Sequence, residues 1–110
     1  MTAQKQTVVA VDPDAPVGTI LPAITDYGKL VLVRHAGGWA AAIDSCPHAG
    51  CSLSDMGELF DETVLVCNCH GSEFDLLTGQ VLRDPAEAPL RVFRVTPTAD
   101  GAGLIIETSI

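Results

Sequence analysis

All four cysteines of this 110-residue chain, and two of its three histidines, lie in two short segments. The first is Cys46-Pro47-His48-Ala49-Gly50-Cys51, and the second is Cys67-Asn68-Cys69-His70-Gly71-Ser72. Each segment pairs a cysteine with a histidine two or three residues later. Thiolate and imidazole are ligands that select transition metals over hard cations such as magnesium and calcium. The two segments together therefore predict a metal centre.

The order of the ligands indicates which metal this centre holds. Zinc sites commonly place two cysteines in one segment and two histidines in another. Here each segment mixes the two ligand types, which suits a binuclear centre in which one iron takes two cysteines and the other takes two histidines. A zinc-binding interaction module stays open as an alternative. A c-type haem is excluded, because the segment from Cys67 to His70 lacks the Cys-x-x-Cys-His spacing.

The two segments closely resemble the Rieske iron–sulfur signature in ligand type, order, spacing and flanking glycines, and a looser similarity extends from about Thr7 to Glu107. The resemblance implies a Rieske 2Fe–2S cluster. It also implies the ligands, with Cys46 and Cys67 on one iron and His48 and His70 on the other. Two thiolates leave the oxidised cluster neutral, whereas four would leave it a dianion, so this ligand set raises the reduction potential.

The resemblance also assigns expected roles to residues around the ligands. Cysteines at the positions of Cys51 and Cys69 form a disulfide in the Rieske proteins of cytochrome bc complexes, although two buried free thiols are the alternative here. Ser72 matches a serine whose hydroxyl bonds to sulfur at the cluster. Phe74 stands where those proteins have a tyrosine, and it brings no hydroxyl.

A proline-bounded segment from Arg83 to Pro89 resembles the loop that covers the cluster in Rieske domains, although a plain surface loop is the alternative. The side chains expected to pack around the cluster loops are Phe74, Pro85 and Pro89.

The chain is acidic, with 6 Lys and Arg against 14 Asp and Glu and a formal net charge of −8. Such a surface disfavours nucleic acid and anionic membranes and favours partners with basic patches. No apolar run approaches the ~20 residues of a membrane helix, and the segment from Met1 to Gln6 carries no apolar signal. A cytoplasmic location is expected, or a periplasmic or exported one if a leader was removed. A disulfide would be unusual in the cytoplasm.

Short β-branched runs separated by Gly, Pro and Asp predict an all-β chain. Pro22 places its strand at a sheet edge, His35 beside a glycine turn is expected to be solvated, and residues 54–57 are expected to form a turn or one helical turn. With the resemblance, one domain over residues 1–110 is expected, a Rieske-like antiparallel β-sandwich with a cluster-binding subdomain at about 45–75. The expected strands cover residues 7–11, 19–24, 30–34, 39–44, 59–60, 63–66, 74–77, 90–95 and 104–107.

The resemblance implies a soluble one-electron carrier, namely a Rieske ferredoxin that passes electrons from a flavin reductase to a terminal ring-hydroxylating oxygenase. No acid–base constellation is evident, so the chain is not expected to be an enzyme by itself. An electron-transfer subunit of a larger oxidase or respiratory complex is the alternative, and the pair Cys51 and Cys69 together with Ser72 favours it.

Overall fold

The computed structural model describes residues 6–46, 50–69, 71–83 and 88–108. Nearly all regular structure in these ranges is β-strand, which confirms the all-β prediction, and no helix within them is long and apolar enough to cross a bilayer. The elements are β1 (Gln6–Ala10), β2 (Ile20–Thr25), β3 (Gly28–His35), β4 (Gly38–Ile43), α1 (Leu53–Met56), β5 (Gly57–Phe60), β6 (Val64–Cys67), β7 (Ser72–Asp75), β8 (Val81–Arg83), β9 (Val92–Pro97) and β10 (Gly103–Thr108).

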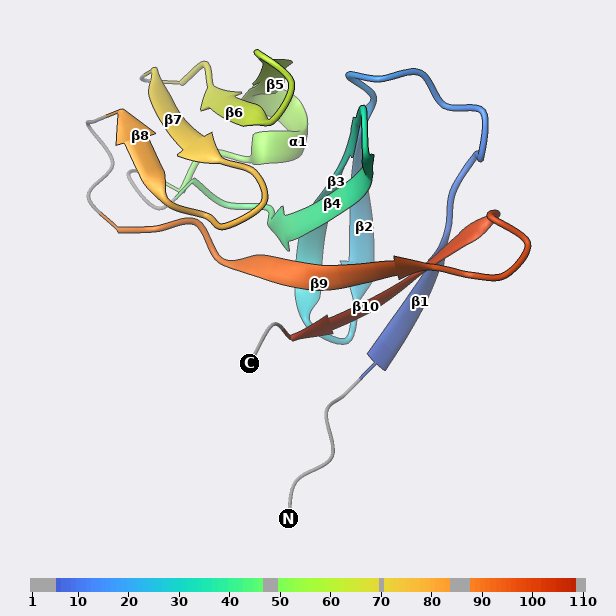
Figure 1. Ribbon diagram of the computed structural model, residues 1–110. Helices are drawn as coiled ribbons and strands as arrows, with labels where there is room; N and C mark the ends of the chain where they lie inside the picture. Colours follow the sequence, from blue (N-terminus) through green and yellow to red (C-terminus); the bar gives the residue numbers. More distant parts are fainter. Residues whose placement is uncertain (1–5, 47–49, 70, 84–87, 109–110) are drawn as a thin grey trace.

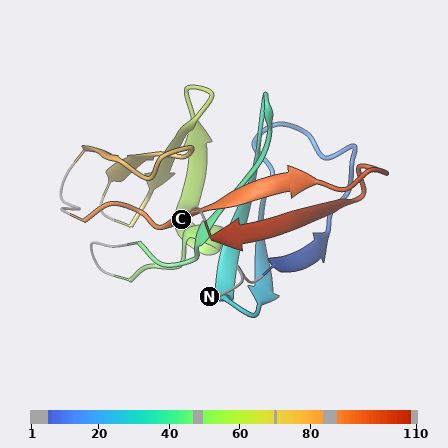
Figure 2. The same cartoon turned by 60° about the horizontal axis from the view of Figure 1, so that its bottom comes forward.

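Six strands form an antiparallel sheet in the order β1-β10-β9-β4-β3-β2. The first strand pairs with the last, with Gln6 opposite Glu107, and β9 joins this pair to the β3–β4 hairpin. The sheet curls until β1 contacts β2, so it forms a partly closed barrel (Figures 1 and 2). Pro22 lies on the edge strand β2, where a missing backbone N–H is tolerated, as its sequence context predicted.

The other four strands form a second antiparallel sheet in the order β5-β6-β7-β8. It lies beside the β3–β4 hairpin in Figure 1. The β5–β6 hairpin turns through the three residues 61–63, because Phe60 pairs with Val64, and Asp61 and Glu62 have left-handed φ angles of 48° and 71°. This hairpin occupies much of the stretch between the two cysteine segments, so the end of β6 delivers Cys67 to the second of them.

Strand β3 contributes side chains to two hydrophobic cores, because successive side chains of a strand point to opposite faces. The barrel core lies inside the six-stranded sheet and consists of Val11, Leu30, Leu32, Ala41, Phe93, Leu104 and Ile106. The intersheet core lies between the two sheets and consists of Val31, Val33, Ala40, Ala42, Cys46, Leu53, Leu65, Cys67, Phe74, Leu76 and Leu90. Burial on both faces explains why residues 30–33 form an uninterrupted apolar run.

Two local features differ from the sequence predictions. Strand β8 was not predicted, because it is three residues long and depends on its pairing with β7, where Val81 lies opposite Phe74. The expectation of a solvated His35 is wrong, since the residue is only 8% exposed. The Gly37 amide donates to its Nδ1 at 3.2 Å, and burial together with the Arg34 charge lowers the pKa of His35. The imidazole is thus part of the β3–β4 turn.

Candidate metal centre

The two cysteine segments form loops that close in the same way. Cys46 follows β4, and its carbonyl oxygen accepts a hydrogen bond from the Gly50 amide at 2.7 Å. Cys67 ends β6, and its carbonyl oxygen accepts from the Gly71 amide at 2.8 Å. Gly50 and Gly71 have φ angles of 74° and 84°, which glycine adopts without a Cβ clash. Each loop therefore turns back sharply with its cysteine at its base.

A disulfide joins the two loops. The Sγ atoms of Cys51 and Cys69 are 2.08 Å apart, and the two residues are separated by 18 positions in the sequence. The Cys51 carbonyl oxygen also accepts a hydrogen bond from the Cys46 amide at 2.8 Å, which closes the base of the first loop. The bridge therefore ties the end of the first loop to the middle of the second.

The thiols of Cys46 and Cys67 lie in the intersheet core, 2% and 1% exposed, and neither is disulfide-bonded. Two buried thiols at the bases of two cross-linked loops match the two-cysteine half of the predicted iron–sulfur centre. The residues present therefore fit such a group. The predicted ligands His48 and His70, like Pro85, lie outside the described residues, and among those that are described no three metal-ligating side chains come together.

Ser72 and Phe74 lie on β7 with their side chains turned inward. Ser72 is the cross-strand partner of Cys67, and both residues are buried. Side chains directly opposite each other on one face of an antiparallel pair have Cβ atoms about 5 Å apart. The Ser72 hydroxyl is thus well placed to donate a hydrogen bond to the Sγ atom of Cys67. Phe74 is completely buried in the intersheet core, together with both thiols.

The segment after β8 meets the metal centre through a residue that the sequence did not single out. Pro89 is exposed, whereas its neighbour Leu90 is 3% exposed and belongs to the intersheet core. The Leu90 amide donates to the Gly79 carbonyl oxygen at 2.8 Å, and the Gly79 amide donates to the Asp75 carbonyl oxygen at 2.7 Å. The turn after β7 therefore fixes the position of Leu90.

A buried carboxylate near the first loop was also missed from the sequence. Asp44 lies two residues before Cys46, and its side chain is fully buried. Burial alone would raise the pKa of Asp44, but hydrogen bonds from the Ser54 hydroxyl and amide and from Lys29 hold that pKa below its usual value. An Asp shortly before the first ligand, followed by Ser-x-Ser just after Cys51, is the signal that could have revealed this contact.

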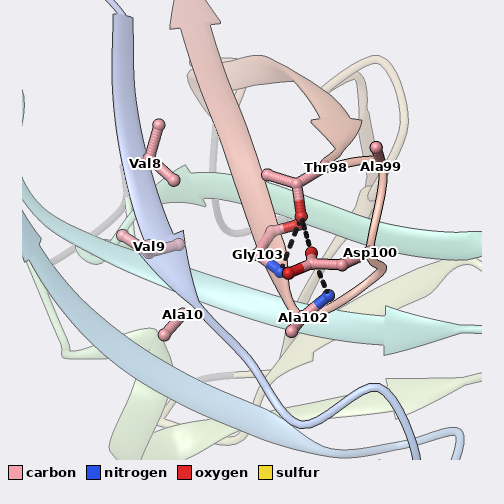
Figure 3. Close-up of a pocket in the computed structure, with 8 residues that line it drawn as sticks. All are labelled: Val8, Val9, Ala10, Thr98, Ala99, Asp100, Ala102 and Gly103. Carbon is pink, nitrogen blue, oxygen red and sulfur yellow. Dashed lines mark hydrogen bonds between the residues drawn. The ribbon is translucent and has the colours of Figure 1, made fainter.

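A shallow hollow elsewhere on the barrel offers no comparable chemistry. It lies between β1 and the turn from β9 to β10 and is lined mainly by small apolar side chains (Figure 3). Its one carboxylate, Asp100, accepts hydrogen bonds from the Thr98 hydroxyl at 2.6 Å and the Ala102 amide at 3.0 Å. The polar groups of the hollow are thus used within the turn itself.

Comparison with known proteins decides the family. The family model for the Rieske [2Fe-2S] domain matches residues 5–94. This chain belongs to the Rieske [2Fe-2S] domain family. The match covers both cysteine loops, and the cofactor of this Rieske protein is therefore a 2Fe–2S cluster.

Relatives of this Rieske chain include ferredoxin subunits of dioxygenases. It is 30% identical over 96 residues to the biphenyl dioxygenase ferredoxin subunit of Pseudomonas sp. (strain KKS102), covering 87% of this chain and 85% of that protein. It is 33% identical over 95 residues to the 3-phenylpropionate/cinnamic acid dioxygenase ferredoxin subunit of Shigella boydii serotype 4 (strain Sb227), covering 86% and 85%. A chain in the structure of the complex of reduced oxygenase and oxidized ferredoxin in carbazole 1,9a-dioxygenase superimposes with a TM-score of 0.80 at 29% identity, covering 93% and 92%.

Removing the Ser72 hydroxyl is expected to lower the reduction potential of this Rieske protein. A hydrogen bond to a cluster sulfur stabilises the more negative reduced state more than the oxidised state. Loss of about 1.4 kcal/mol of such stabilisation corresponds to a fall of about 60 mV for a one-electron couple. Direct electrochemistry of Ser72→Ala and wild type measures the difference. An unchanged potential would show that this hydroxyl does not bond to the cluster.

Proposed function

We propose that this Rieske chain is a one-electron carrier, the ferredoxin component that takes electrons from a flavin reductase and delivers them to a terminal ring-hydroxylating oxygenase. The observation that carries the proposal is the pair of buried thiols, Cys46 and Cys67, at the bases of two matching loops. Relatives that align with more than four fifths of this chain include ferredoxin subunits of dioxygenases.

In this proposal the Cys46 and Cys67 thiolates hold one iron, and His48 and His70 hold the other. When bound, the cluster supplies a centre that accepts and releases one electron. The chain's own side chains do the rest. The intersheet core keeps water from the thiolates, the Cys51–Cys69 bridge fixes the two loops together, and the Ser72 hydroxyl donates to sulfur. Because the thiolates are enclosed, electrons enter and leave through the histidine side.

The proposed carrier comprises one domain over residues 1–110 and works in the cytoplasm with protein partners. It performs no chemistry on an organic substrate, in keeping with relatives that are carrier subunits of dioxygenase systems. The formal net charge of −8 supports docking to basic surfaces on the reductase and the oxygenase.

One observation favours a second candidate, an electron-transfer subunit of a larger oxidase or respiratory complex. The Cys51–Cys69 bridge corresponds to the extra disulfide of bc-type Rieske proteins. Rieske centres span about −150 to +300 mV, and a redox titration separates the candidates. A potential near the upper end supports the oxidase or respiratory subunit, and one in the lower half supports the ferredoxin.

The proposed function predicts that electron delivery to the oxygenase depends on this chain and weakens with salt. Reductase and oxygenase components recovered by pull-down would be mixed with it in a stopped-flow instrument. Raising the ionic strength from about 0.01 to 0.5 M shortens the Debye length from about 30 Å to a few Å, so the second-order rate should fall by about tenfold or more. Oxygenase reduction that proceeds equally without this chain would contradict the function. A rate indifferent to salt would point to apolar docking instead.

A further inference from the structure

The buried Asp44 carboxylate is contacted by serine hydroxyls, a backbone amide and a lysine ammonium group. Its Oδ1 accepts from the Ser54 amide at 2.6 Å and from the Ser52 hydroxyl at 3.2 Å. Its Oδ2 accepts from the Ser54 hydroxyl at 2.6 Å and from the Ser52 hydroxyl at 3.3 Å, and it lies 3.3 Å from Lys29 Nζ. A carboxylate with both oxygens occupied in this way holds its donors in one arrangement, because leaving a buried charge unsatisfied is costly.

These contacts connect the two ends of the first ligand loop. Asp44 lies two residues before that loop, which begins at Cys46, and Ser52 and Ser54 lie one and three residues after its last residue, Cys51. The backbone already joins Cys46 to Cys51 at the base of the loop. The carboxylate adds a second link between the segment that enters the loop and the segment that leaves it. The two segments are therefore fixed relative to each other.

The same carboxylate anchors the loop to the barrel. The Asp44 amide donates to the Lys29 carbonyl oxygen at 3.0 Å, and Lys29 belongs to β3. Ser54 lies in α1, whose N-cap residue Ser52 makes no capping bond with its own side chain. Asp44 accepts the Ser54 amide in its place, and so connects the end of β4 with the segment that leads into the four-stranded sheet.

We propose that Asp44 is a positioning residue for the metal centre: by holding Ser52 and Ser54, its carboxylate keeps the first ligand loop in the geometry that binds the cluster. This inference rests on the proposed ligand role of Cys46. It assigns Asp44 no contact with the cluster. Its effect passes through the loop, so it concerns how firmly and in what geometry the cluster is held.

The test compares Asp44→Asn with a variant that is equally destabilised far from the loop. Ile106 belongs to the barrel core and is fully buried, so Ile106→Val or Ile106→Ala can be chosen to match the melting temperature of Asp44→Asn. Cluster loss from the full-length holoprotein is followed by visible absorbance at a temperature where both variants stay folded. Asp44→Asn should lose the cluster about tenfold faster than the matched control, the scale seen when groups supporting metal ligands are removed.

A second readout distinguishes positioning from stability alone. The g values of the reduced protein and the visible circular dichroism report ligand geometry, and they should shift in Asp44→Asn and stay as wild type in the Ile106 variant. If Asp44→Asn does not fold, Ser54→Ala and Ser54→Thr decide the question, since only the first removes the hydroxyl that Asp44 accepts. Faster loss in Ser54→Ala with recovery in Ser54→Thr supports the proposal.

Equal rates of cluster loss in Asp44→Asn and the matched Ile106 variant, with unchanged spectra, would overturn the positioning role. So would equal behaviour of the two Ser54 variants. None of these measurements uses a redox partner. A wild-type protein that fails to deliver electrons would therefore refute the proposed carrier function and leave this test intact.

Discussion

Replacing Gly79 by alanine is expected to destabilise the protein by roughly 2–5 kcal/mol and to loosen the metal centre. A Cβ at this position would lie 1.9 Å from the Leu90 carbonyl oxygen, and Gly79 has a φ of 82°. The left-handed backbone contributes about 1–2 kcal/mol of the cost and the forced displacement of Leu90 about 1–3 kcal/mol. Because Leu90 packs in the core that holds both thiols, the variant should also release the cluster sooner.

Gly101→Ala is the matched control for this prediction. Gly101 has a similar φ of 74°, yet an added Cβ there would meet nothing within 4 Å. Gly101→Ala should therefore lower the free energy of unfolding only by the cost of the left-handed backbone, about 1–2 kcal/mol, and should retain the cluster normally. Urea unfolding of both variants gives the comparison. Equal losses of stability would mean that the Leu90 segment moves aside freely and that the Gly79 contact does not position it.

Breaking the bridge between Cys51 and Cys69 is expected to have the other large effect. The bond closes a loop across 18 positions of the chain, for which restriction of the unfolded state is worth about 3 kcal/mol. Cys51→Ser should lower the free energy of unfolding by about that amount. It should also speed cluster loss, since the loops carrying Cys46 and Cys67 would no longer be tied to each other.

Reductant provides the control for the bridge. Dithiothreitol should destabilise the wild type and have no further effect on the stability of Cys51→Ser. Alkylation of denatured protein without reductant, followed by mass analysis, should leave Cys51 and Cys69 unlabelled in the wild type. Full labelling of both would show that the bridge is absent under the conditions in which the protein was prepared.

The metal centre was more predictable from the sequence than the framework that holds it. Cys46 and Cys67 could be singled out because ligand type and spacing are dictated by the chemistry of the cluster and lie within short segments. Strands β3 and β4 were also recognisable, since an apolar run ending in Gly37-Gly38 has few other structures to adopt. Local chemistry and local pattern were sufficient for these elements.

Contacts made only after folding were not predictable in this way. Asp44 reads as a polar residue at the end of a strand, and its partners Ser52 and Ser54 stand 8 and 10 positions away, so they meet only once the loop between them has closed. In the sequence, His35 looks like a surface residue beside a turn. Its burial depends on how that turn folds back over the imidazole ring, which the sequence does not show. The packing role expected of Pro89 belongs to its neighbour Leu90, since sequence alone does not show which of two adjacent residues faces inward.

The double-sided burial of β3 limits how this metal centre could be transplanted into another protein. A graft of residues 45–75 would carry both thiols and the bridge. It would leave behind Val31 and Val33, which belong to the same hydrophobic core as the thiols. A graft that included the β3–β4 hairpin would restore these two valines, but it would expose Leu30 and Leu32 on the opposite face of β3. The recipient would have to cover that apolar face with a sheet of its own. The smallest fragment that could hold the metal centre in another protein is therefore close to the whole chain.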